Sequence, residues 1–249
     1  MALPLAAQTP AFDVASVRPQ PWTNEGQVAV YVRGNTLYGE HADLCTLIDF
    51  AWNLPPDSSQ VTGGPGWARH GVLSNAAGWD EALFQVIAKA PSGTSPSAEE
   101  FRQMLRAYLA ERFRLRVRVE NREQRVFRLV TAKDGVKLTA SAADAAASLR
   151  MADGKVFRMR AVHMPIARLV EQLSNPTHGA GRPVVDETGL AGFYDFNIDW
   201  LPADVAVAEG DGKASTVFSA LANLGLKLEP GTAAVPVVVI EHAEMPGAN

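Results

Sequence analysis

Residues 97–119 read SAEEFRQMLRAYLAERFRLRVRV and change hydrophobic periodicity partway along. Ser97 and two glutamates suit the start of a helix, where the helix dipole favours negative charge. From Leu115 onward, apolar residues alternate with charged ones, as in a strand with one buried side. The helical part carries an apolar stripe made of Phe101, Met104, Leu105, Tyr108 and Leu109. A helix with one apolar side, followed by a strand with one buried side, predicts an α+β fold.

The rest of the chain shows a similar plan twice. A constant shift that aligns His41 with His163 also aligns the helical stripes that follow them, so that Leu44 falls on Ile166, Leu47 on Leu169 and Ile48 on Val170. Each stripe follows an alternating, strand-like segment. We therefore expect an internal duplication: two related βαβ-type units, each a short mixed or antiparallel sheet with helices packed on one face.

The expected organisation has four parts. Residues 139–154 are rich in alanine and poor in large apolar groups, which is typical of a linker. Residues 125–132 are expected to form a hairpin with the strand that starts at Leu115. The parts are a tail at 1–11, a first α+β unit at 12–138, the linker at 139–154 and a second α+β unit at 155–249.

Composition favours a folded protein. Hydrophobic residues make up 47% and charged residues 20% of the chain, unlike disordered sequences. The net charge of −4 provides no overall positive field, so we expect no nucleic-acid partner. No apolar run is long enough for a transmembrane helix. Cys45 is the single cysteine, which excludes an intramolecular disulfide, and its apolar helical surroundings predict core packing.

The N-terminal residues suggest export. Residues 2–7 read ALPLAA and are followed by Gln8 and Thr9, which resembles the last part of a secretory signal peptide. This interpretation predicts a secreted protein, periplasmic or extracellular. An ordinary flexible N-terminus is the alternative.

Several motifs occur in an order that resembles a known family. They are FDVASVRP at 12–19, QVTGGPGW at 60–67, RPVVDETGLAGFYDFNIDW at 182–200 and the tail from Ser219. Over nearly its whole length the chain resembles an exported family of unknown function that is abundant in Acidobacteria (Solibacter-type). Each half also resembles the short N-terminal domains of secretins and TonB-type outer-membrane receptors. The resemblance implies export but no established chemistry, and Arg118 stands where the family often has histidine.

Residues 184–196, VVDETGLAGFYDF, are the most distinctive candidate site. Their carboxylates could hold a divalent cation, Ca²⁺ or Zn²⁺, because Ca²⁺ takes carboxylate and carbonyl oxygens from tight loops. No other cofactor is predicted. The alternative is structural, with Asp186 and Thr188 capping a turn that the nearby glycines allow. The candidate metal ligands are Asp186, Glu187 and Asp195.

Histidines and aromatic residues supply the other candidates. No HExxH pair and no GxSxG elbow occurs, but a Ser/His/Asp triad built from distant residues stays open, because triads are recognised by geometry. The matched His41 and His163 could share a metal or acid–base role, or be inherited capping residues. Aromatic side chains could line a pocket or pack in the core. The candidate catalytic residues are His163, His178, Asp186 and Asp195, and the candidate ligand-binding residues are Trp67, Trp79 and Tyr194.

Two functions compete. The first is an exported, non-catalytic binding or envelope-assembly module, whose sheet edges add a strand from an envelope protein partner or whose surface takes a small-molecule ligand. The second is a secreted hydrolase of small esters or lactones, such as acyl-homoserine lactones, with or without metal assistance.

Overall fold

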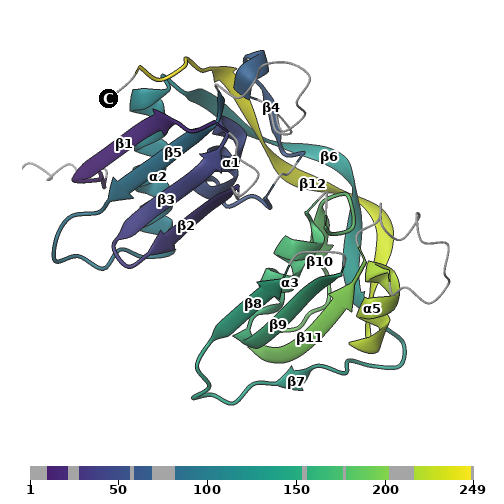
Figure 1. Cartoon of the computed structure of the whole chain (residues 1–249). Helices are drawn as coiled ribbons and strands as arrows, with labels where there is room; N and C mark the ends of the chain where they lie inside the picture. Colours follow the sequence, from purple (N-terminus) through teal and green to yellow (C-terminus); the bar gives the residue numbers. More distant parts are fainter. Residues whose placement is uncertain are drawn as a thin grey trace, which may run out of the picture. The chain divides into compact units, whose positions relative to one another are not determined.

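A computed structural model describes residues 10–21, 28–56, 59–68, 82–152, 156–175, 178–201 and 216–247 (Figure 1). It confirms the α+β class: helices pack on mostly antiparallel sheets of four strands each. No described helix is long and apolar enough to cross a membrane. The chain divides into two compact units, the first made of Met1–Glu120 with Pro236–Asn249 and the second of Asn121–Val235.

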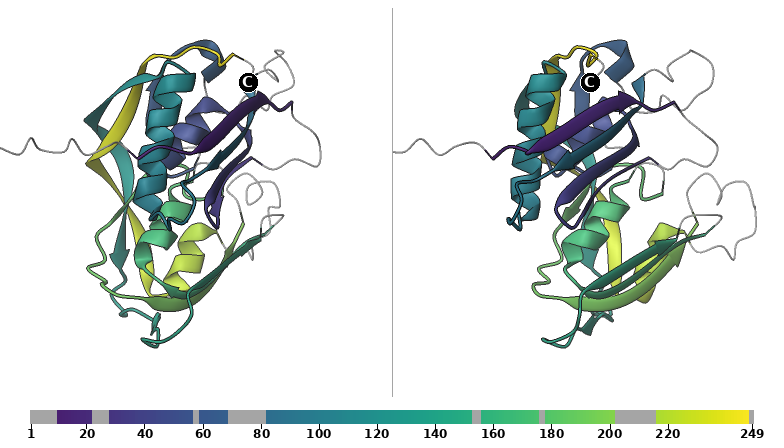
Figure 2. Two further views of the ribbon diagram at one scale, coloured as in Figure 1. Left: turned by 90° about the vertical axis from the view of Figure 1, so that its left-hand side faces the viewer. Right: turned by 60° about the vertical axis from the view of Figure 1, so that its left-hand side comes forward.

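The first unit is built on an antiparallel sheet in the order β1-β5-β3-β2. Figure 2 shows α1 and α2 on one side of this sheet. Leu37 and Val86 from the sheet and Leu47 and Leu105 from the helices are fully buried in the core between them. The elements are β1 (Val14–Pro19), β2 (Ala29–Arg33), β3 (Thr36–Ala42), α1 (Leu44–Ala51), β5 (Phe84–Lys89) and α2 (Ala98–Arg112).

The second unit repeats this arrangement with other residues. Its antiparallel sheet has the order β7-β11-β9-β8, and α3 and α5 cover one side (Figure 2). Met159, Leu169 and Leu221 are fully buried between the layers. The elements are β7 (Thr139–Ala140), β8 (Ser148–Ala152), β9 (Phe157–Met164), α3 (Ile166–Leu173), β11 (Tyr194–Trp200) and α5 (Val217–Asn223).

Two long strands form the middle of a third sheet, in the order β10-β6-β12-β4. The short outer strands run parallel to their neighbours, β10 to β6 and β4 to β12. Each long strand contributes to both cores. β12 places Leu226 and Leu228 in the second core and Val238 and Ile240 in the first, while β6 buries Leu129 in the second core and packs Val117 against the first. The elements are β4 (Val61–Gly63), β6 (Arg116–Thr131), β10 (Val184–Asp186) and β12 (Leu226–His242), with a 3-10 turn, η1 (Gly66–Ala68), after β4.

The two units share one order of elements. In each unit the order is three strands, a helix, a short strand, another strand, a second helix and a long strand. The antiparallel sheets β1-β5-β3-β2 and β7-β11-β9-β8 also have the same strand order. His41 and His163 lie at equivalent points, just before α1 and α3. Both have a left-handed backbone, with φ of 45° and 53°, which is uncommon for a residue other than glycine. The sequence shift therefore aligns residues of the same backbone conformation.

Local capping interactions explain where α1 and α2 begin. The Asp43 carboxylate accepts the N–H of Thr46 at 2.6 Å and so caps α1. Ser97 and Glu100 form a reciprocal capping box at α2. The expected stripe of α2 is buried, and so is Cys45.

The unit boundaries differ from the expected ones. Residues 139–154, expected as a linker, contain β7 and β8, which pair with β11 and β9 in the second sheet. Residues 236–249 belong to the first unit, and 121–138 to the second. The expected hairpin at 125–132 is wrong, since β6 continues without a turn from Arg116 to Thr131. A distant partner strand, β12, keeps this polar segment extended.

Candidate functional site

The second unit brings together a serine, a histidine and an aspartate. Asp195 is the second residue of β11, His163 lies near the end of β9 and Ser141 directly follows β7. Because β11 lies between β7 and β9, these three side chains meet at one end of the sheet. All three are partly exposed. We call Ser141, His163 and Asp195, with the adjacent Phe193, the polar cluster.

Hydrogen bonds and one ring stack define its geometry. Asp195 Oδ1 accepts the backbone N–H of His163 at 2.8 Å. His163 Nδ1 lies 3.3 Å from Ser141 Oγ. The backbone N–H of Ser141 donates to the Phe193 carbonyl at 3.0 Å. The Phe193 ring stacks on the imidazole of His163, with centroids 4.2 Å apart and planes within 7°.

A β-bulge explains why the histidine is held this way. The register between β9 and β11 shifts between Tyr194 and Phe196, and His163 adopts its left-handed conformation there. A bulged residue loses its ladder partner, so its N–H needs another acceptor. Asp195 supplies that acceptor in the second unit. In the first unit, Gln20 Oε1 accepts the N–H of His41 at 2.8 Å.

The same contacts shift the acidity of Asp195. The N–H of His163 and then the hydroxyl of Ser141 donate to the carboxylate, and together they lower the pKa of Asp195 from its ordinary value of 3.8. Hydrogen bonds to the charged form favour that form. The carboxylate therefore stays ionised over the whole neutral range.

Replacing Asp195 by asparagine is expected to make the free energy of unfolding less dependent on pH in the acidic range. A depressed folded-state pKa contributes stability above the unfolded-state value, about 3.8, and this contribution is lost as the pH falls through the folded-state pKa. The free energies of unfolding of wild type and Asp195→Asn, measured with urea, should therefore differ at neutral pH and converge in acid. A constant difference across that range would contradict the assignment.

The expected metal ligands are engaged in separate contacts. Asp186 Oδ1 accepts both the N–H and the hydroxyl of Thr188, at 2.9 and 2.7 Å, which supports the capping alternative. Glu187 forms an ion pair with Arg128. Asp195 belongs to the polar cluster. Among the described residues, no group of three or more His, Cys, Asp or Glu could hold a metal ion.

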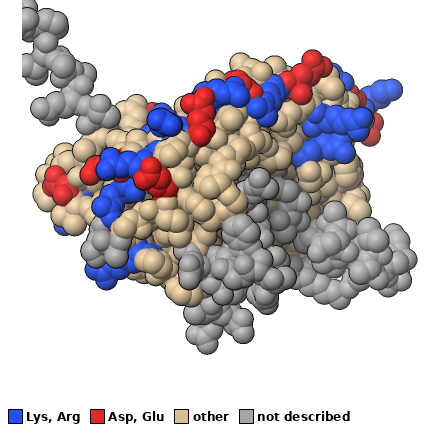
Figure 3. Space-filling model, turned by 90° about the horizontal axis from the view of Figure 1, so that it is seen from above, with Lys and Arg blue, Asp and Glu red and all other residues tan. Residues whose placement is uncertain are grey.

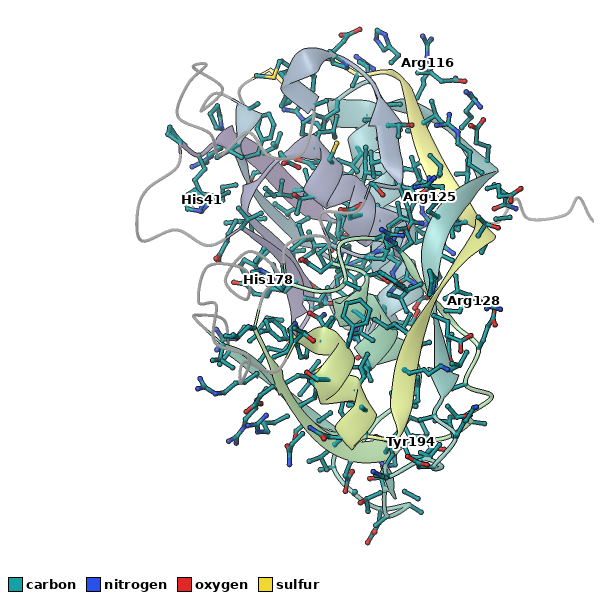
Figure 4. All side chains as sticks on the ribbon, turned by 90° about the vertical axis from the view of Figure 1, so that its right-hand side faces the viewer. His41, Arg116, Arg125, Arg128, His178 and Tyr194 are labelled. Carbon is teal, nitrogen blue, oxygen red and sulfur yellow. The ribbon has the colours of Figure 1, made fainter. Side chains whose placement is uncertain are left out.

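The remaining candidates are spread over both units. Tyr194 and His178 lie at opposite ends of β11 in the second unit, and Tyr194 donates its hydroxyl to the Ala191 carbonyl (Figure 4). His178 stacks on Phe157 and its carbonyl accepts Trp200 Nε1–H, so it supports the second core. Trp67 packs against the first core. Trp79 lies outside the described residues.

Sequence reasoning missed Ser141. This serine lies in the alanine-rich stretch that was interpreted as a linker, where no periodicity singles it out. Its partners come from strands more than twenty residues away along the chain.

A second surface feature lies on the edge strand β2 of the first unit. β2 pairs with β3 on one side and ends the sheet on the other. Tyr31, Val32 and Arg33 are all exposed. Tyr31 stacks on Tyr38 and donates its hydroxyl to Glu40 Oε1 at 2.7 Å, and this bond is the main cause of a raised Tyr31 pKa.

Charges elsewhere are mixed. Figure 3 shows Lys and Arg interspersed with Asp and Glu along the face seen from above. Arg118 forms ion pairs with Glu120 and Glu241 in the first unit, and Arg128 pairs with Glu229 as well as Glu187 in the second. Such neutralised arginines produce no broad positive field.

The family follows from comparison with known proteins. Residues 45–243 match the model of a family described as "Protein of unknown function (DUF3738)", and the chain therefore belongs to that family. This confirms the expectation of a family of unknown function. No curated protein and no solved structure matches the chain.

Proposed function

We propose that the protein is an exported binding module that adds an extended segment of an envelope protein partner to β2. The observation that carries this proposal is the exposed edge of the first sheet, where Tyr31, Val32 and Arg33 lie together. Strand addition is a common way to bind an extended peptide, because main-chain hydrogen bonds supply affinity. Export rests on residues 2–7, which lie outside the described residues.

The hairpin geometry indicates which backbone groups would bind. Arg33 pairs with Thr36 across the two-residue turn Gly34–Asn35, and Gly34 has φ of 60°, as a type II′ turn requires. The pair that closes such a turn is hydrogen-bonded, and bonded and non-bonded pairs then alternate. Val32 and Val30 are therefore in non-bonded pairs. Their N–H and C=O groups point away from β3, toward the free edge.

Side chains at this edge define the partner. Val32 lies on the helix-covered side of the sheet and is 37% exposed, so it favours an apolar residue beside it. Tyr31 and Arg33 lie on the other side and favour polar or acidic neighbours. The segment that fits alternates apolar and acidic residues.

Replacing Val32 by proline is expected to weaken peptide binding strongly without unfolding the protein. Proline removes an outward N–H and is tolerated on an edge strand, because no bond to β3 is lost. Peptides that wild type selects from a displayed random library should bind Val32→Pro at least roughly tenfold more weakly.

The matched control is Ile87→Lys, which changes an equally exposed residue of the central strand β5. This variant should keep wild-type affinity. Equal binding by Val32→Pro, loss of binding in Ile87→Lys, or no selected peptides at all would each refute strand addition at β2.

We further infer that the two units arose by internal duplication. The shared element order, the shared strand order and the left-handed histidines at equivalent points support this inference. β8 is then the counterpart of β2. It also ends its sheet and exposes Arg150 and Met151.

A further inference from the structure

We infer that the polar cluster is a hydrolytic site for small esters and lactones, in which Ser141 Oγ is the nucleophile and His163 Nδ1 is its base. A binding module needs no such chemistry, so this inference is independent of strand addition at β2. It rests on the grouping and exposure of Ser141, His163, Phe193 and Asp195.

The cluster has the parts that nucleophilic catalysis requires. Ser141 Oγ lies 3.3 Å from His163 Nδ1, close to hydrogen-bond length, and such contacts are often loose before substrate binds. Asp195 fixes the histidine through its backbone N–H and also accepts from the Ser141 hydroxyl. The single hydroxyl proton can thus be donated to the carboxylate or to the imidazole. Partial exposure of all three residues allows substrate to reach them.

The equivalent bulge at His41 in the first unit shows which side chains the backbone conformation itself requires. Gln20 follows β1 as Ser141 follows β7, and each donates its backbone N–H to the residue before the neighbouring strand, at 2.8 and 3.0 Å. There a neutral amide caps the N–H of His41, and that histidine is only 7% exposed. The fold therefore does not require a serine and a carboxylate at this point. The second unit adds both, and leaves its histidine more accessible.

The reaction balances with water as the second substrate. Ser141 Oγ forms a bond to the ester carbonyl carbon while its proton passes to His163 Nδ1. The carbon–oxygen bond to the alcohol then breaks, and the imidazolium returns the proton to the departing alkoxide. Water, deprotonated by the same nitrogen, then attacks the acyl-serine carbonyl carbon. The bond from that carbon to Ser141 Oγ breaks, the imidazolium returns the proton to Ser141 Oγ, and the acid is released. Asp195 remains a carboxylate throughout, as its lowered pKa requires.

Phe193 indicates the substrate class. Its ring is 48% exposed and lies flat against His163, so it offers an apolar surface beside the reacting hydroxyl. An acyl chain or a lactone ring with a short aliphatic substituent fits such a surface.

The test measures hydrolysis of 4-nitrophenyl butyrate and labelling by a fluorophosphonate, followed by peptide mass spectrometry. Wild type should turn over the ester and carry the label on Ser141. Ser141→Ala should lose both, and kcat/KM should fall roughly a hundredfold or more, as for loss of a nucleophile or base. His163→Asn keeps a residue that tolerates the left-handed backbone and should lose turnover equally.

Controls separate this site from the fold and from the first unit. Ser148→Ala changes a serine of the same sheet and should keep wild-type kcat/KM, as should Ile87→Lys in the first unit. Circular dichroism and thermal melting confirm that each variant is folded. Absence of both turnover and label in wild type, a label on another residue, or full activity in folded Ser141→Ala would overturn the inference.

Discussion

Replacing Trp200 by alanine is expected to lower the free energy of unfolding of the second unit by about 3–5 kcal/mol, as for large core aromatics. Trp200 is 1% exposed and its ring lies 4.5 Å from Phe157 between centroids. Its indole N–H donates to the His178 carbonyl, which would lose this donor in the variant. The cavity and the lost bond act in the same direction.

Denaturant unfolding followed by circular dichroism measures this loss. Met151→Ala is the matched control, because Met151 is 50% exposed in the same unit and its removal should change stability by about 0.5 kcal/mol or less. A Trp200→Ala variant within about 1 kcal/mol of wild type would contradict the described core.

Replacing Val238 by aspartate is expected to unfold the first unit, although Val238 lies near the C-terminus. Val238 is fully buried in the first core, and its N–H donates to the Gln60 carbonyl at 2.7 Å. Burying an unpaired carboxylate there should cost at least about 4 kcal/mol, a large share of a typical domain's stability.

Hydrogen exchange with mass spectrometry locates the effect. Amides of β3 and α1 should exchange faster in Val238→Asp, and those of β9 and β11 should change least. Ala234→Asp adds the same charge at an exposed position of β12 and should leave β3 and α1 protected. Faster exchange confined to β9 and β11 would contradict the assignment of residues 236–249 to the first unit.

Local structure could be predicted from the sequence because local interactions determine it. The stripe and first-turn acids of α2 depend on neighbours within a few residues, and the structure buries that stripe and adds the capping box. The alignment of His41 with His163 likewise survives in three dimensions, since both histidines share a backbone conformation.

Non-local pairing could not be predicted in the same way. β12 runs through Pro230, Gly231 and Pro236, which usually interrupt strands, and β6 runs through the polar residues 121–124. These segments stay extended because each lies beside the other in the third sheet. No periodicity within either segment reports a partner a hundred residues away.

Two of the three polar residues of the candidate site could be predicted from the sequence, and the third depends on non-local strand pairing. His163 and Asp195 stand in distinctive segments and meet in the structure. Ser141 joins them only through the pairing of β7 with β11, a two-residue contact that leaves no pattern in the sequence. Asp186 stands out equally in sequence, but it caps a turn.

Residue-resolved amide exchange with a selected peptide tests strand addition at β2 most directly. On binding, the amides of Val30 and Val32 should become protected, because they point to the free edge. Those of Tyr31 and Arg33 should change little, since they already bond to β3. The proposal would be contradicted if the bound peptide protected amides of β5 or of the second unit instead, or protected no amides at all.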